Sequence, residues 1–473
     1  MARAPKPAVP KQVVTVRMYK NLLGDCFLLR IVEKQKTAHI LIDCGILQNV
    51  AGDRETMQAV AASVVADTNG HLDLLVVTHE HHDHISGFAH AADTFFSDHL
   101  TIGNLWMAWT ENERDPQAQA LNARFNTVKQ AVSLAAGRAA TMAAAGVSEA
   151  DDLLVGLQNF IGVVEMPDDP PGATERLTGR VIMRKLKEKV REKGVEPRFL
   201  EPGTVLDTPG AASLRAHVLG PPRTPERLFQ DLPTRSSGEA HETYLGKRFA
   251  AADDLLSVVV DPSRPFGESP FPPRFALTEA EVRKGGDTAS DWINAHYYGG
   301  ETTQKVETEW LGSAGALALK LDSDTNNTSL ALAFEMRDGR ILIFAADAQV
   351  GNWLSWHDQD YGEPPVKAAD LLRRTVFYKV GHHASHNATL RDDGLELMNG
   401  GDLVAMIPVV ETVARAQGSK GWNMPYPPLL ARLNALTRNR VIRGDEPTDV
   451  ARFPPGRLRT HKDDLWVEYD VRI

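Results

Sequence analysis

The residues best suited to chemistry lie in one short run, Thr78-His79-Glu80-His81-His82-Asp83-His84. Imidazole and carboxylate groups are ligands that Zn²⁺ prefers and that Mn²⁺ and Fe²⁺ also accept. We expect His79 and His81 to share one metal ion, because alternate residues of an extended turn project to the same side. Asp83 and His84 follow the bend and are expected to reach a second ion a few ångströms away.

The segment that leads into this run is apolar. Residues 72–77 have the length and composition of a short buried strand. Polar ligands in the loop after a buried strand are typical of the sites of α/β proteins. The alternative is a cluster of surface histidines that binds no ion. The density of potential ligands directly behind an apolar strand favours the metal site.

The spacing His-x-His-x-Asp-His resembles the signature of the metallo-β-lactamase-fold hydrolases, and other segments match in the same order. Residues 24–29 and 40–45 resemble the opening strands of that family, and residues 326–348 resemble the strand whose terminal aspartate, here Asp347, bridges two metal ions. Residues 379–387 resemble the Lys-Val-x-His-His-Gly-Ser segment of one branch. That branch includes the hydrolase domain of bacterial competence DNA-uptake channels.

This resemblance implies a fold, a cofactor and a set of site residues. The implied fold is α/β, a four-layer αββα metallo-β-lactamase sandwich with a helical insertion and a long irregular insertion. The implied cofactor is two divalent metal ions, with Zn²⁺ preferred and Mn²⁺ or Fe²⁺ as alternatives. The implied metal ligands are His79, His81, Asp83, His84, Asp347 and His383. The implied catalytic residues are Asp83, Asp347 and His382, of which His382 contacts the substrate or protonates the leaving group.

The chain departs from the pattern of this branch at a few positions. Gly220 stands where a further metal-binding histidine is often found, so the first ion is expected to bind more weakly, through His79, His81, Asp347 and solvent. Ala346 and Ala384 stand where glycine is usual. These replacements are tolerated unless the backbone needs a positive φ there. Because Ala384 can bend its loop differently, the order of ligand and catalytic residue within the pair His382 and His383 stays open.

Composition and charge limit the class of protein. The chain has 473 residues and a net charge of −10, which counts against a protein that coats nucleic acid indiscriminately. The N-terminal residues lack the apolar region of a secretory signal, and no stretch has the apolar length of a membrane span. Its two cysteines, Cys26 and Cys44, lie in apolar segments and predict buried thiols in a reducing, cytoplasmic location.

The pattern of elements predicts a sandwich with two interruptions. Its first half is expected at 12–110 with 200–221, and its second half at 310–473. A helical insertion is expected at 111–199, with helices at 116–146, 149–163 and 173–194. A Pro/Gly-rich insertion or lid is expected at 222–309, with a helix at 278–296.

Three functions fit these features. The first is a hydrolase that uses a metal-bound hydroxide on a phosphodiester, as a nuclease or phosphodiesterase does. The second is a lactone, thioester or lactam hydrolase with the same metal site, since fold alone does not choose a substrate. The third is a largely non-catalytic metal-binding partner that uses the insertions to contact another protein. Trp353 and Trp356, close after Asp347, are expected either to stack a nucleobase or to lie in the core.

Overall fold

The computed structural model describes residues 12–33, 36–47, 50–144, 179–233, 279–298, 309–417 and 421–473. The chain divides into two compact units. The first unit consists of Met1–Ala123, Pro170–Lys247 and Asp322–Ile473, and it contains both large sheets. The second unit consists of Arg124–Asp169 and Arg248–Leu321. Its described elements are the larger part of α4 (Pro116–Ala144) and of α11 (Glu309–Asn326), together with α9 (Glu279–Lys284), α10 (Thr288–Ile293) and η5 (Asn294–Tyr298).

The first large sheet contains eight strands in the order β16-β17-β1-β2-β3-β5-β7-β8. Their bounds are β1 (Gln12–Tyr19), β2 (Phe27–Glu33), β3 (Lys36–Ile42), β5 (Leu74–Val77), β7 (Leu105–Ala108), β8 (Arg198–Leu200), β16 (Leu458–Thr460) and β17 (Trp466–Arg472). Pairing is antiparallel from β16 to β3 and parallel from β3 to β8. A small parallel pair, β4 (His71–Leu72) and β6 (Thr101–Ile102), lies outside the two large sheets.

The second large sheet contains seven strands in the order β15-β14-β13-β12-β11-β10-β9. Their bounds are β9 (Val205–Thr208), β10 (Ala211–Gly220), β11 (Ala331–Glu335), β12 (Ile341–Phe344), β13 (Thr375–Lys379), β14 (Val404–Ile407) and β15 (Val441–Arg443). The strands from β12 to β15 are parallel. Their carboxyl ends therefore meet at one edge of the sheet, where loops can place polar side chains together.

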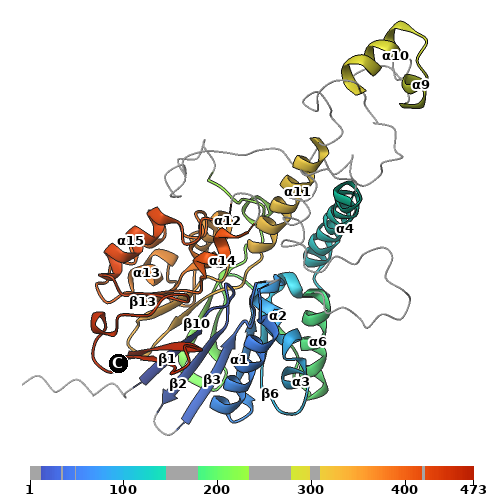
Figure 1. Cartoon of the computed structure of the whole chain (residues 1–473). Helices are drawn as coiled ribbons and strands as arrows, with labels where there is room; N and C mark the ends of the chain where they lie inside the picture. The colour runs from blue at the N-terminus through green and yellow to red at the C-terminus, as the bar shows by residue number, and fades with distance from the viewer. Residues whose placement is uncertain are drawn as a thin grey trace, which may run out of the picture. The chain divides into compact units, whose positions relative to one another are not determined.

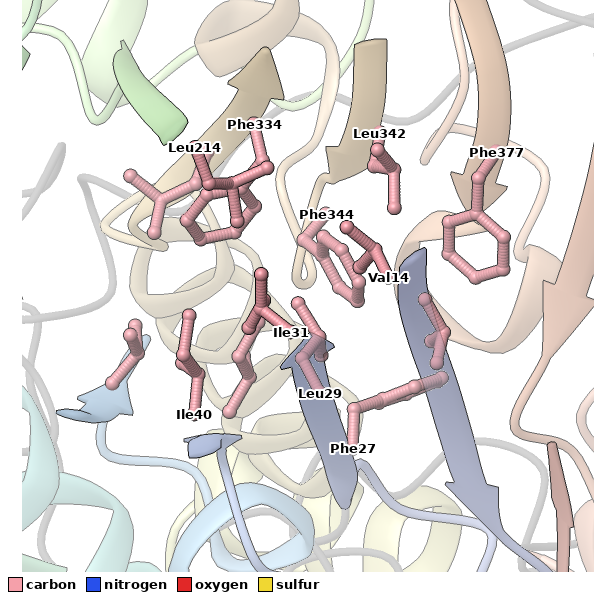
Figure 2. Packing of buried hydrophobic residues seen from close by; sticks show 14 of the residues in the cluster. Val14, Phe27, Leu29, Ile31, Ile40, Leu214, Phe334, Leu342, Phe344 and Phe377 are labelled. Carbon is pink, nitrogen blue, oxygen red and sulfur yellow. The ribbon is translucent and has the colours of Figure 1, made fainter. Parts of the chain in front are cut away.

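The inner faces of the two sheets form one hydrophobic core (Figure 2). Phe27 of the first sheet meets Phe344 of the second edge to face, with ring centroids 5.9 Å apart, and Phe377 lies 5.6 Å from Phe344. Along β2, Leu29 points into this core while Leu28 packs on the opposite face. This alternation has the period of two that a strand with both faces buried imposes.

Helices cover both outer faces of the sandwich (Figure 1). On the first sheet these are α1 (Asp53–Thr68), α2 (His82–His90), α3 (Ala92–Phe95) and α6 (Gly179–Glu192). On the second sheet they are α12 (Val350–Trp356), α13 (Ala368–Arg373), α14 (Glu411–Arg415) and α15 (Pro427–Thr437). The short elements α7 (Pro225–Leu228), η1 (Trp109–Glu111), η8 (Gly381–Ala384), η9 (Leu395–Leu397) and η10 (Val450–Arg452) complete the described set. The predicted αββα architecture is confirmed.

The two sheets divide the chain differently from the predicted halves. Strands β9 and β10, expected with the first half, hydrogen-bond into the second sheet through β11. The C-terminal strands β16 and β17 pair instead with β1, where Val467, Tyr469 and Val471 join the core between the sheets. Local pattern predicts that a segment is a strand, but the choice of its neighbour depends on long-range packing.

Several other predictions can be compared with the described residues. Helices α4 and α6 lie within the predicted ranges 116–146 and 173–194, while 149–163 and most of 222–309 lie outside the described residues. Where a single helix was expected at 278–296, the chain forms α9, α10 and η5. Cys26 and Cys44 are buried free thiols, as predicted. In the part of the chain that the structure describes, no helix is both long enough and apolar enough to cross a membrane.

We predict that Phe344→Ala lowers the free energy of unfolding by about 3–5 kcal/mol, the usual cost of removing a buried aromatic side chain. Phe344 is 2 % exposed and its ring contacts aromatic rings from both sheets. Val450→Ala is the control, because Val450 is 53 % exposed and its truncation should change stability by less than about 0.5 kcal/mol. Denaturant unfolding of both variants in a chelator measures the difference, and equal effects would contradict the assigned core.

Candidate metal centre

The run of histidines is fixed on the first sheet by backbone contacts. Strand β5 ends at Val77, and helix α2 begins at His82 with His81 as its extended N-cap residue. The backbone N–H of Asp25 donates to the carbonyl of Asp83 over 2.9 Å. A Cβ atom on Gly45 would lie 2.2 Å from the carbonyl carbon of Asp83, so only glycine permits this approach. The loop therefore rests directly on the segments that follow β1 and β3.

The second sheet supplies the other side of the cluster. Asp347 follows β12, and the pair His382 and His383 follows β13, the parallel neighbour of β12. The backbone N–H of His382 donates to Oδ1 of Asp347 over 3.2 Å, which ties the two loops together. The parallel pairing thus brings residues separated by 35 positions to one edge of the sheet.

The six predicted metal ligands lie together in the structure. Nε2 of His84 is 3.1 Å from Oδ2 of Asp347 and 3.8 Å from Oδ2 of Asp83. Nε2 of His383 is 2.8 Å from the same Asp83 oxygen. The His79 ring lies 4.1 Å from the His84 ring and 4.7 Å from the His81 ring, measured between centroids. The cluster therefore joins the two sheets at one end of the sandwich.

Three imidazoles are oriented by acceptors at their Nδ1 atoms. Nδ1 of His84 donates to Oδ2 of Asp43 over 2.7 Å, and Nδ1 of His383 donates to the carbonyl of Pro408 over 2.7 Å. Thr78 donates its hydroxyl proton to Asp43 and so accepts at Oγ1 from Nδ1 of His79, 3.0 Å away. Each arrangement turns the Nε2 atom towards the cluster, the orientation that metal-bound histidines require.

Asp43 has no role as a direct ligand in this arrangement. Its two oxygens accept from the backbone N–H and hydroxyl of Thr78 and from His84. It is fully buried at the end of β3. Asp43 thus fixes both the start of the loop and the ring of His84.

The charges of the cluster are unbalanced without a further cation. Asp25, Asp43, Asp83 and Asp347 are carboxylates close to His84, and Lys379 is the lysine that lies among them. Its ammonium group pairs with Asp25, lies 3.6 Å from Asp347 and is 1 % exposed. Burial alone would raise the pKa values of Asp83 and Asp347, but the neighbouring imidazoles hold both well below the ordinary range.

The imidazoles respond to these carboxylates in different ways. Burial lowers the pKa of His79, and the nearby rings of His84 and His81 lower it further. Burial also opposes protonation of His84 and His383, but the surrounding aspartates outweigh it and raise both pKa values. Without a metal, protons on these two rings therefore balance part of the carboxylate charge. A divalent cation would displace such protons as it binds.

The donor set fits a metal ion by its own chemistry. Nε2 of His79 is buried and has no hydrogen-bond partner, which is costly for a polar atom. The ligand atoms of Asp25, His84, Asp347 and His383 lie within 4.8 Å of one another, and all four side chains are buried. Imidazole nitrogens and carboxylate oxygens without thiolates suit Zn²⁺, Mn²⁺ or Fe²⁺.

His382 lies in a loop with an uncommon backbone conformation. The φ angles of His382, His383 and Ala384 are +40°, +50° and +64°. Ala346 also has a positive φ, of +49°, so both alanines that replace a usual glycine occupy conformations that favour glycine. Burial lowers the pKa of His382 to about 4, so its imidazole is neutral at pH 7. Its Nε2 lies 4.0 Å from Oδ2 of Asp347, and its side chain is 16 % exposed.

Gly220 leaves no room for a ligand side chain. A Cβ atom there would lie 2.0 Å from Oδ1 of Asn352. That amide cannot easily move, because Asn352 accepts from the Trp356 indole over 2.9 Å and donates to two backbone carbonyls. Asn352 is fully buried. The hydrogen-bonded side chain of Asn352 therefore fills the space that a histidine side chain at position 220 would need.

Other sequence candidates lie away from the cluster. Trp353 and Trp356 are fully buried and stack on each other with ring centroids 3.9 Å apart. Of the two expectations for them, stacking on a nucleobase or packing in the core, the structure shows packing in the core. Nδ1 of His82 lies 3.2 Å from the carbonyl of Ile46, on the outer side of the loop.

Two carboxylates near the cluster were not among the predicted site residues. Asp25 lies in a segment that the sequence comparison had already singled out, next to a strand, so its position could have been found. Asp322, at the end of α11, places Oδ1 3.7 Å from Nε2 of His81. Burial, together with Asp83 and Asp347, raises the pKa of Asp322 to about 6, although His81 opposes the shift. No local pattern marks Asp322 in the sequence.

Comparison with known families supports the same assignment. The family model described as Metallo-beta-lactamase superfamily matches residues 20–284, more than half of the chain. This range includes β2, β3, β5 and the run of histidines. No curated protein matches the chain.

We predict that Gly220→Ala lowers the free energy of unfolding by about 1–3 kcal/mol, the usual cost of overpacking a rigid interior. The added methyl group would collide with Asn352, which three hydrogen bonds hold in place. Gly137→Ala in α4 is the control, because its Cβ would meet no atom within 4 Å. That change should stabilise the helix by up to about 1 kcal/mol. Thermal and denaturant unfolding compare the two, and a neutral Gly220→Ala would refute the proposed crowding.

Proposed function

The chain belongs to the metallo-beta-lactamase superfamily, whose members are mostly hydrolases, and we propose that it is a metal-dependent phosphodiesterase or nuclease. The observation that carries the metal-dependent part is the buried cluster itself. Six potential ligands from both sheets lie together, and Nε2 of one of them, His79, is buried without a hydrogen-bond partner. Such a group is most simply satisfied by a cation.

The residues that would hold two divalent ions follow from the positions of their donor atoms. His79 and His81 lie side by side and would hold the first ion. Asp83, His84 and His383 have mutually close donor atoms and would hold the second. Asp347, near His84 and His382, would bridge both ions. Such ions, Zn²⁺ foremost, lower the pKa of a water molecule towards neutrality and polarise the bond that is broken.

The remaining polar residues of the cluster have separate roles. Lys379 is buried against Asp25 and Asp347, so it balances carboxylate charge and does not bind substrate. His382 is partly exposed, its ring is neutral at pH 7, and its Nδ1 atom has no hydrogen-bond partner. We propose that His382 contacts the substrate. Its imidazole N–H would donate a hydrogen bond to a substrate oxygen, or the ring would pass a proton to the leaving group.

The choice of a phosphodiester depends on the segment 379–387. It resembles the branch associated with phosphate-ester substrates, and its two histidines lie beside Asp347 and Asp83. Of the polar side chains that follow, Ser385 donates to Asn387, and Asn387 donates to the backbone of Asp231. His382, which lies beside Asp347, is the residue of this segment that we assign to an anionic oxygen of the substrate.

A substrate panel tests this proposal. The metal-free protein would be incubated with bis-p-nitrophenyl phosphate, single-stranded DNA and a lactone, each with and without added Zn²⁺ or Mn²⁺. We expect metal-dependent cleavage of the phosphodiesters and little turnover of the lactone. Faster turnover of the lactone would assign the chain to carboxyl-ester chemistry. Bound metal without turnover of any substrate would favour a metal-binding partner protein.

We predict that alanine at one of the two adjacent histidines lowers the metal content and that alanine at the other leaves it unchanged. His383→Ala should reduce bound metal and activity together, because Nε2 of His383 faces Asp83. His382→Ala should keep its metal and lose turnover by roughly 10²–10⁴-fold, the usual contribution of a positioned acid–base group. Elemental analysis and steady-state kinetics measure both effects. Exchanged phenotypes would reverse the two roles, and unchanged metal in both variants would remove His383 from the ligand set.

A further inference from the structure

The proposed first metal position lacks the side chain that the second sheet would supply from position 220. His79 and His81 supply two imidazoles. Position 220, at the end of β10, cannot supply a third side chain, because Asn352 occupies the space that a Cβ atom would need. Zinc sites in proteins generally have three or four protein ligands. A site with two imidazoles and one shared carboxylate would therefore bind its ion weakly unless another donor lies nearby.

Asp322 is such a donor. It belongs to the last turns of α11 and to the same compact unit as both sheets. Its Oδ1 lies 3.7 Å from Nε2 of His81. Its other oxygen accepts from Nδ2 of Asn326, one turn further along the same helix, over 3.3 Å, which leaves Oδ1 to face His81. Among the residues described by the structure, His81 provides the only basic nitrogen within 4 Å of this carboxylate.

The separation of these two atoms suits a shared ion better than a hydrogen bond. A distance of 3.7 Å exceeds the range of an N–H···O bond. Two ligands at about 2.1 Å from one tetrahedral Zn²⁺ ion lie about 3.4 Å apart. The nitrogen of His81 that faces Asp322 is Nε2. The Nε2 atom of the neighbouring His79 is buried and has no hydrogen-bond partner. Both observations fit donors that share a cation better than donors in direct contact.

We propose that Asp322 is a ligand of the first metal ion, supplied by helix α11 in place of the side chain that is missing at Gly220. This proposal rests on the metal binding included in the proposed function. In this chain the ligand would be a carboxylate oxygen from a helix. In the branch that the sequence resembles, the ligand is often a histidine nitrogen at the position of Gly220, at the end of a strand. The first position then has His79, His81, Asp322 and the bridging Asp347.

The test compares Asp322→Asn with the unaltered full-length protein in metal titrations and in melting experiments. The substitution keeps the size of the side chain and removes its charge. We expect the unaltered protein to bind two equivalents of Zn²⁺ or Mn²⁺ after chelator treatment. Asp322→Asn should keep one equivalent with unchanged affinity and bind the other at least about 100-fold more weakly, more than the loss of an outer hydrogen bond causes.

Melting temperatures separate a ligand from a residue that only supports the fold. In chelator, Asp322→Asn should melt at the same or a higher temperature, because the substitution removes a partly buried negative charge close to Asp83 and Asp347. With added metal, the variant should gain less stability than the unaltered protein, since an ion that binds only the folded state stabilises it by mass action. The size of that difference gives the loss in affinity independently of activity.

Two further variants serve as controls. Asp322→Glu retains a carboxylate and should recover a measurable part of the second equivalent. Asp324→Asn makes the same chemical change in the same helix, at a buried position two residues after Asp322. It should bind both equivalents as the unaltered protein does.

Each outcome decides between the alternatives. If Asp322→Asn binds both equivalents normally, Asp322 is no ligand and the proposed function stands without it. If the variant is destabilised in chelator and its metal binding is unchanged, Asp322 supports only the fold, which also overturns the inference. If the unaltered protein binds no metal, the proposed function fails and this inference fails with it.

Discussion

The mutual repulsion of carboxylates that are buried or partly buried is the constraint on which this structure depends. Asp83 comes from the first sheet and Asp347 from the second, and the packing of Phe27 against Phe344 holds the two sheets close together. Negative charges that are brought together away from water oppose folding unless positive charge lies among them. Lys379 supplies one fixed charge, and two protonated imidazoles supply more. A pair of divalent cations would satisfy the same requirement at neutral pH.

Much of the fold could be predicted because its signals are local. The apolar segment that ends at Val77 and the dense ligands after it predict a strand and a site loop from adjacent residues alone. Asp347 and His383 also follow apolar strands, and the parallel pairing of β12 with β13 brings such ends together. The four-layer class follows from alternating strands and helices whose inner and outer faces are both apolar.

The features that the sequence could not supply depend on long-range contacts. The pairing of β17 with β1 joins the two ends of the described chain, and no local pattern encodes that choice. The crowding at Gly220 depends on Asn352, which lies more than a hundred residues later. Asp322 lies in a helix whose sequence gives no sign of a site, and only the tertiary structure brings it to His81. Such residues are found from interatomic distances and burial in the folded structure and not from the spacing of residues along the sequence.

An aspartate in place of a histidine would also change the chemistry of the first metal position. A neutral imidazole leaves the full charge of a divalent ion to act on water and substrate, whereas a carboxylate offsets part of that charge. The ion would then be held more strongly by electrostatic attraction and would polarise its ligands less. Oxygen ligands also shift preference from Zn²⁺ towards harder cations such as Mn²⁺. With Asp322, the first position would have two imidazoles and two carboxylates, the same set of donors as Asp83, His84, His383 and Asp347 give the second, so the two positions would favour the same metal.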